Sequence, residues 1–188
     1  MKKLLYTLLV VSIIFSACEK EDDDPSSSSG DNNNSALAIG DTHQGGIVFY
    51  LDGNSGGLIA APSDQSLEAE WGCYGTAISG ADGTAIGTGA QNTIDIEGGC
   101  LNSGTAADIC ANLTLGGYSD WFLPSKDDLN EIYVNLYSQG IGGFSSDSYW
   151  SSTEHNNGSA WKQHFLNGGD QSNGGKDSGY YVRAIRAF

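Results

Sequence analysis

The sequence predicts an α+β fold with a mostly antiparallel sheet, because short β-rich segments precede and follow a central part that carries two helix-start signals. Glycine accounts for 27 of the 188 residues, and charged residues make up 16% of the chain, below the roughly 25% of an average globular domain. A long-helix or coiled-coil protein is therefore disfavoured. With 39% hydrophobic residues, the chain can still bury a core.

The first strands are predicted to form a hairpin. Residues 46–51 (GIVFYL) and 57–61 (GLIAA) are apolar runs, and the sequence DGN between them favours a turn. The same turn resembles the start of a calcium-binding loop, but its twelfth position is Ser63 instead of a glutamate. We therefore expect a hairpin turn. Incidental calcium binding by exposed carboxylates stays open.

The stretch between Trp71 and Cys100 is rich in Gly, Thr, Ala and Ser and has no sustained periodicity. It is predicted to be a long ordered loop or a series of turns. Its glycines do not indicate a phosphate-binding loop, since no Gly-Lys-Ser/Thr follows them.

Two helices are predicted from their capping patterns. Thr105 and Asp108 form a capping box that opens a short helix, and Ser125 and Asp128 open a second one, for which Gly140 is the stop. One face of the first helix holds Ile109, Cys110 and Leu113, and the core-facing stripe of the second holds Leu129, Ile132, Tyr133 and Leu136.

The last part of the chain is predicted to be β-structure. Residues 149–153, 160–166 and 180–187 are β-rich, and Asn167-Gly168 favours a hairpin turn. Because side chains alternate along a strand, one face of the second run is expected to be core. That face holds Trp161, Gln163 and Phe165, and the opposite face holds Ala160, Lys162, His164 and Leu166.

The N-terminus carries export signals. Lys2 and Lys3 precede the uncharged run 4–15, which is too short to span a bilayer and typical of a signal peptide. Small residues before Cys18 resemble a lipobox, which predicts a signal peptide over residues 1–17 and lipidation of Cys18; a plain signal peptide is the alternative.

Residues 18–35 are acidic and then rich in Ser and Asn, so they are predicted to be a solvated tether. Their start resembles a surface-export signal of Bacteroidetes-type lipoproteins, although a charged linker is an alternative. The expected location is the outer membrane, lipid-anchored and surface-exposed, with no other membrane contact.

Residues 36–188 remain as the folded domain. They hold 17 acidic and five basic residues, a formal charge of −12 within the −15 of the whole chain. Such a charge repels phosphate backbones, so nucleic acid is excluded as a partner.

Three cysteines remain in the domain, an odd number for an oxidising compartment. We expect a disulfide between Cys100 and Cys110, which are close in sequence, with Cys73–Cys100 as the alternative pairing.

Three ordered motifs carry a family resemblance. The segments GYSDWFLPS (117–125), YWSST (149–153) and YVRAIR (181–186) resemble the pattern of the Lcl C-terminal domain family, over roughly residues 40–188. The resemblance implies a C-type-lectin-like fold with two helices packed on mostly antiparallel strands, with long loops. It also implies an adhesin for sulfated polysaccharides, but a domain at −12 is a poor match for that ligand.

The sequence contains no recognisable catalytic or metal-binding motif. The three histidines have no metal-ligand spacing, and no frame such as Gly-x-Ser-x-Gly selects a nucleophile. The related formylglycine-generating enzymes use a cysteine pair near their C-terminal half, whereas every cysteine here precedes Ala111. We therefore predict a protein that is not an enzyme, with no cofactor and no metal site.

Two polar segments, 154–159 and 167–176, are the predicted recognition loops, since such residues provide adaptable hydrogen bonds on a rigid scaffold. The sequence thus predicts an adhesin-like surface lipoprotein that recognises an extracellular glycan or protein. A binding protein diversified by a retroelement and a structural envelope lipoprotein without a specific ligand are alternatives. The predicted ligand-binding residues are His155, Asn156, Asn157, Ser159, Lys162, His164, Asp170, Gln171 and Asn173.

Overall fold

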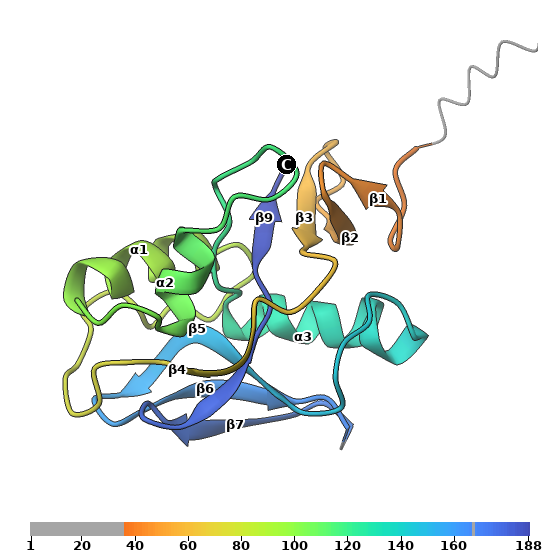
Figure 1. The fold of residues 1–188 in the computed structure, drawn as a ribbon. Coiled ribbons are helices and arrows are strands. Elements are labelled where there is room, and N and C mark those ends of the chain that lie inside the picture. The colour runs from red at the N-terminus through yellow and green to blue at the C-terminus, as the bar shows by residue number, and fades with distance from the viewer. Residues whose placement is uncertain (1–35, 167) are drawn as a thin grey trace, which may run out of the picture. The chain divides into compact units, whose positions relative to one another are not determined.

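Two β-sheets and three α-helices make up the described part of the chain, residues 36–166 and 168–188 of a computed structural model (Figure 1). The predicted α+β class with mostly antiparallel strands is confirmed. The predictions for the signal peptide, Cys18, the tether and Asn167 fall outside the described residues. None of the described helices is long and apolar enough to cross a membrane.

The smaller sheet has the strand order β1-β2-β3-β9. Its strands are β1 (Thr42–His43), β2 (Gly46–Leu51), β3 (Gly57–Ala60) and β9 (Ile185–Ala187). The predicted hairpin of β2 and β3 is confirmed. Asp52 Oδ1 accepts hydrogen bonds from the N–H groups of Asn54 (2.6 Å) and Gly56 (3.1 Å), so this carboxylate stabilises the turn.

The larger sheet has the order β4-β8-β5-β6-β7. Only the β5–β8 pair among the described strands is parallel, with Tyr149 opposite Tyr181. The strands are β4 (Ser66–Glu70), β5 (Ser148–Asn156), β6 (Ser159–His164), β7 (Asp170–Gly175) and β8 (Gly179–Val182).

Two details of the β prediction were wrong. Residues 170–175, expected to be a loop, form the edge strand β7, which pairs with β6 through six successive residues. The run 180–187, expected to be one strand, is divided between β8 in the larger sheet and β9 in the smaller one. Arg183 and Ala184 lie between them and are buried where the chain passes from one sheet to the other.

The helices are α1 (Gly89–Gly99), α2 (Ala106–Ala111) and α3 (Lys126–Asn135), and α3 is followed by a 3₁₀ turn at Tyr137–Gln139. The structure confirms α2 and α3 with their N-caps, Thr105 and Ser125. Helix α1 was predicted as loop. It was missed because its buried face includes Asn92 and Thr93, whereas an amphipathic helix is recognised by an apolar stripe.

Helix α3 lies between the two sheets (Figure 1). Leu129, Ile132 and Leu136 are buried against Phe49 of β2 and Tyr149 of β5, which confirms the predicted stripe. A second cluster contains three tryptophans from distant segments, Trp71, Trp121 and Trp150, together with α1 and α2 residues. Both faces of the larger sheet therefore contact core side chains.

The N-terminus of α3 is fixed by a reciprocal capping box. Ser125 Oγ accepts from Asp128 N–H (3.2 Å) and donates to Ala85 C=O (2.9 Å), and Asp128 accepts from Ser125 N–H (2.9 Å). We expect Ser125→Ala to lower the free energy of unfolding by about 1–2 kcal/mol in urea denaturation. Ser138→Ala removes an exposed hydroxyl from the 3₁₀ turn that follows α3 and is expected to cost less than about 0.5 kcal/mol. Equal losses in the two variants would contradict the assigned cap.

The disulfide prediction was wrong in its favoured pairing. Cys73 is bonded to Cys100, with their Cα atoms 5.7 Å apart, and Cys110 is a buried free thiol among the described cysteines. The pairing was predicted wrongly because helix α1 was not foreseen. Cys100 is the C-cap residue of α1, so its position depends on that helix and not on its closeness to Cys110 in the sequence. Cys110 lies in α2 and packs into the tryptophan-containing core cluster.

Candidate ligand-binding surface

The turn between β5 and β6 lies beside an exposed aromatic ring. Tyr74 is 63% exposed, and a Cβ built on Gly158 in the turn would lie 3.6 Å from Tyr74 Cε2. Gly75 N–H donates to Asn157 C=O over 2.8 Å, which joins the Tyr74 loop directly to the turn. Two segments that are far apart in the chain therefore form one surface.

A second aromatic side chain, Trp161 of β6, is partly exposed near the same turn. The His155 ring meets it edge-on, with centroids 5.5 Å apart, and Lys126 Nζ lies 4.0 Å from its ring centroid. His155 Nδ1 is 3.0 Å from both Ser159 Oγ and Asn156 Nδ2. We call the resulting set the turn surface; it consists of Tyr74, Lys126, His155, Asn156, Asn157, Ser159 and Trp161.

A buried ion pair connects the end of β5 to the loop that carries Tyr74. Lys176 is fully buried, forms a salt bridge with Glu154, and donates to Thr76 C=O over 2.8 Å. Its Nζ also lies 4.4 Å from a Trp71 ring centroid. Glu154 Oε1 accepts from Ile78 N–H (2.9 Å) as well. The end of β5 and residues 76–78 are thus held by one shared pair of charges.

The disulfide fixes the other end of the Tyr74 loop. Cys73 precedes Tyr74 directly and is bonded to Cys100 at the end of α1. Gly72 has φ 100°, and a Cβ there would lie 2.5 Å from Thr105 Cγ2, so the close approach to α2 requires glycine. Tyr74 is therefore presented by a preorganised loop, which reduces the entropy lost on binding.

The structure divides the predicted ligand-binding residues into separate groups. His155, Asn156, Asn157 and Ser159 lie together on the turn surface, and exposed Asn173 is paired opposite Trp161. Lys162 and His164 point to the opposite face of the sheet, since they alternate with Trp161 and Gln163 along β6, and Asp170 lies on that face because it is paired with His164. Gln171 donates to Lys126 C=O over 2.9 Å, which makes it a support for α3.

Lys162 has partners of its own on that opposite face. Its ammonium group donates to Ser148 Oγ (3.2 Å) and Ser172 Oγ (3.3 Å) and lies 5.0 Å from the Tyr180 ring centroid. Lys162 and His155 therefore cannot contact one small ligand together across the sheet.

Sequence reasoning missed three members of the turn surface. Trp161 was assigned to the core, although it is only partly buried, and Tyr74 and Lys126 were not singled out. Tyr74 had one usable signal, its position next to a cysteine in a glycine-rich segment. Lys126 had none, because its contact with Trp161 depends on how α3 packs over β6.

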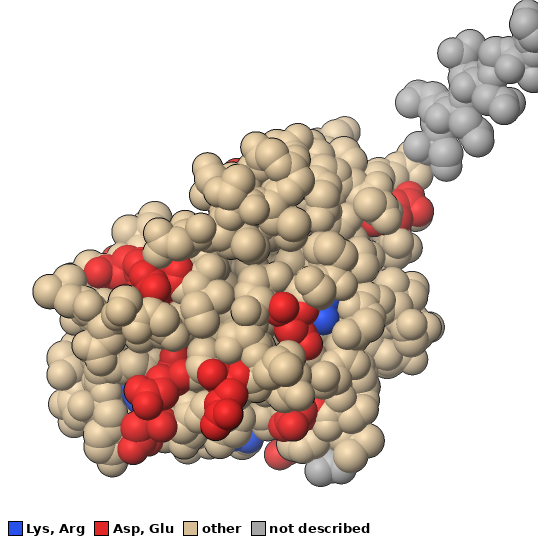
Figure 2. Space-filling model, viewed as in Figure 1, with Lys and Arg blue, Asp and Glu red and all other residues tan. Residues whose placement is uncertain are grey.

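Most basic side chains of the domain are buried in ion pairs and are not exposed to solvent. Lys176, Arg183 and Arg186 are buried and each forms a salt bridge with a carboxylate. Figure 2 shows several acidic clusters on the face viewed, with only small basic areas between them. An acidic face of this kind disfavours polyanions.

Two kinds of reactive site, a nucleophilic cysteine and a metal centre, can be checked among the described residues. Burial and the nearby Glu97 carboxylate raise the pKa of Cys110, which disfavours the thiolate that a nucleophile requires. Between residues 36 and 188, apart from residue 167, no cluster of three His, Cys, Asp or Glu side chains is arranged to hold a metal ion.

The three sequence motifs meet in space. Phe122 forms an isolated bridge with Ile185, Ser152 N–H donates to Pro124 C=O over 2.7 Å, and Asp120 forms a salt bridge with Arg186. The Arg186 guanidinium lowers the pKa of Asp120, which keeps this exposed carboxyl charged. The motifs therefore build the scaffold and do not contribute to the turn surface.

These features define an α+β scaffold domain that presents a polar and aromatic surface at one turn. A family model described as the Lcl C-terminal domain matches residues 64–186, more than half of the chain. The chain belongs to this family, and the predicted resemblance is confirmed. The match begins at residue 64 and not near 40, so β1, β2 and β3 precede it. No curated protein matches the chain.

Proposed function

We propose that the chain is a lipid-anchored surface protein whose domain, over residues 36–188, binds an extracellular glycan or protein without chemistry. The observation that carries this proposal is the turn surface, where two aromatic rings and several amide and hydroxyl groups lie on a loop and turn held by a disulfide and a buried ion pair. Membership of a family named for an adhesin supports the same function.

The composition of the turn surface suits such a ligand. Aromatic rings provide rigid apolar contact area, and Asn, Ser and His side chains provide adaptable hydrogen bonds. Sugar rings offer both apolar C–H faces and hydroxyl groups, and protein surfaces offer the same combination. Sulfated polysaccharide is a poor candidate, because 17 acidic residues face only five basic ones in the domain.

The anchor and the fold type belong to the same proposal. A signal peptide over 1–17, lipidation at Cys18 and a tether over 18–35 would carry the domain to the outer membrane surface. A C-type-lectin-like arrangement, in which loops at one end bind ligand, agrees with a recognition surface built from the 72–78 loop and the β5–β6 turn.

Binding of residues 36–188 to an array of glycans and extracellular proteins tests this function. We expect saturable binding to at least one class of ligand. Tyr74→Ala and Trp161→Ala are each expected to weaken that binding about 30-fold or more, as removal of an interface anchor does. Binding to no glycan or protein would contradict the proposal and favour a structural envelope role.

Matched variants separate the turn surface from other parts of the domain. Val134→Ala and Leu67→Ala remove exposed apolar side chains elsewhere and are expected to leave binding unchanged within about twofold. Lys162→Ala and His164→Ala test the opposite sheet face. If these two variants abolish binding while Tyr74→Ala does not, the ligand binds the opposite face of the sheet and the turn surface is not the site.

A further inference from the structure

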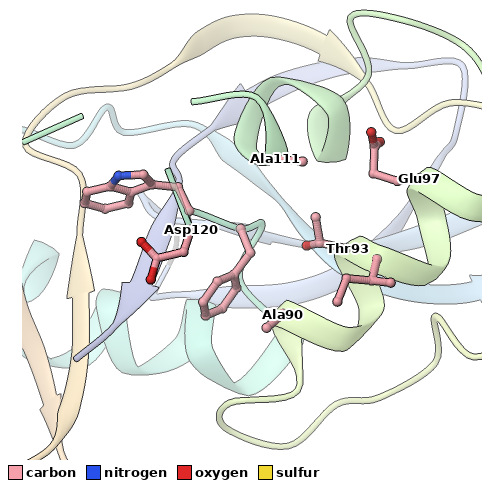
Figure 3. Close-up of a pocket in the computed structure, with 8 residues that line it drawn as sticks. Ala90, Thr93, Glu97, Ala111 and Asp120 are labelled. Carbon is pink, nitrogen blue, oxygen red and sulfur yellow. The ribbon is translucent and has the colours of Figure 1, made fainter. Parts of the chain in front are cut away.

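A pocket of about 370 Å³ lies between α1, the end of α2 and residues 120–122 (Figure 3). This volume falls within the range of about 300–1,000 Å³ that is usual for small-molecule sites. None of its lining residues belongs to the turn surface. The pocket is lined by Ala90, Thr93, Ile94, Glu97, Ala111, Asp120, Trp121 and Phe122.

The walls of the pocket are mainly apolar. Ile94 is 64% exposed although it is a large apolar side chain, and it lines the pocket together with Phe122. An exposed apolar side chain at a concave site gains free energy when a ligand covers it. The pocket therefore favours a ligand with an apolar part.

One polar group in the pocket lacks a partner. Glu97 Oε1 is buried, and no donor within the described residues bonds to it. Burial raises the pKa of Glu97, and the neighbouring Asp108 carboxylate raises it further. A buried carboxylate oxygen without a donor costs free energy, and a cation beside the carboxylate would offset that cost.

The other polar groups of the pocket already have partners. Thr93 Oγ1 donates to Gly89 C=O (2.8 Å) and accepts from Leu123 N–H (3.1 Å). Asp120 forms a salt bridge with Arg186. Figure 3 shows Glu97 beside Ala111 and Asp120 at the opposite side of the pocket. Of the two carboxylates that line the pocket, Glu97 is thus the one without a cationic partner among the described residues.

We propose that this pocket binds a small apolar primary amine, whose ammonium group donates to Glu97 and whose apolar part contacts Ile94 and Phe122. An anionic ligand would meet the Glu97 and Asp120 carboxylates that line the pocket and be repelled. A neutral ligand would leave the Glu97 charge unpaired. The proposal concerns a second site and does not depend on the turn surface.

Isothermal titration calorimetry of the full chain tests this site with three ligands of similar shape: phenethylamine, 2-phenylethanol and 3-phenylpropionate. We expect phenethylamine to bind at least tenfold more tightly than the alcohol and the carboxylate. Glu97→Gln keeps the shape of the side chain and is expected to reduce amine affinity at least tenfold. Ile94→Ala is expected to reduce it severalfold through lost apolar contact.

Asp95→Asn is the matched control, because Asp95 is also a carboxylate of α1 but does not line the pocket. It is expected to leave amine affinity within twofold of the wild type, and thermal melting checks that every variant is folded. Three results would each overturn the proposal: no amine binding at millimolar concentration, equal binding of amine and alcohol, or equal losses in Glu97→Gln and Asp95→Asn. The last result would indicate attraction to the net negative charge and not a site.

Discussion

Arg183→Met is expected to lower the free energy of unfolding by about 3–5 kcal/mol, because it leaves a partly buried carboxylate and several carbonyl groups without their cation. Arg183 is buried between β8 and β9. Its guanidinium donates to Asp64 Oδ1 (2.7 Å) and to the carbonyl oxygens of Ala61 (2.8 Å) and Gly142 (2.9 Å). Chemical denaturation followed by tryptophan fluorescence measures the loss.

A double-mutant cycle separates the charge from the packing. Asp64→Asn combined with Arg183→Met removes both charges, so the double variant is expected to be less unstable than the sum of the two single losses. Arg183→Lys keeps the charge but loses the planar guanidinium group with its several donors. Its free energy of unfolding is expected to lie between those of the wild type and Arg183→Met. A loss below about 1 kcal/mol for Arg183→Met would show that this network does not stabilise the fold.

Removal of the disulfide is expected to have the second largest effect. Cys73→Ser combined with Cys100→Ser opens a loop with a sequence separation of 27 residues, and the chain-entropy model gives a cost of roughly 3–4 kcal/mol. The Tyr74 loop is also expected to lose its fixed position, since Cys73 is adjacent to it. Thermal unfolding under oxidising and reducing conditions measures the loss of stability.

Cys110→Ala is the matched control for the disulfide. It removes a buried sulfur without opening a covalent loop, so we expect a cost of about 1 kcal/mol and the same difference between reduced and oxidised protein as in the wild type. Peptide mapping under non-reducing conditions checks the pairing itself. Recovery of a Cys100–Cys110 peptide would contradict the assigned bond.

The sequence predicted those elements that carry local signals. The capping residues Thr105 and Ser125 mark α2 and α3, and the apolar runs on either side of Asp52 mark the first hairpin, because these signals depend on neighbouring residues only. The three family motifs were also recognisable, and they pack together as parts of one scaffold.

The elements that were missed depend on distant partners. Helix α1 buries Asn92, whose amide donates to Gly83 C=O (2.7 Å) and Ser152 Oγ (3.2 Å), so its inward face is polar. Strand β7 (DQSNGG) contains no β-branched or aromatic residue and is defined by its pairing with β6. Because Cys100 ends α1, missing that helix also led to the wrong disulfide.

The candidate site was predicted only in part for a similar reason. The polar turn residues 155–159 were visible as a loop-like segment, and four of them lie on the turn surface. Tyr74 joins them through tertiary contacts between segments far apart in the chain, and Lys126 joins them from the first turn of α3. Neither contact has a signature in local sequence.

Chemical-shift mapping by NMR tests the central claim, which is that ligand binds at the turn surface. Labelled protein spanning residues 36–188 is titrated with the strongest ligand from the array. We predict that the largest amide shifts lie at residues 73–76 and 155–161, with little change around His164 and Asp170. Largest shifts on that opposite sheet face, or at Glu97 and Phe122 in the pocket, would contradict the claim.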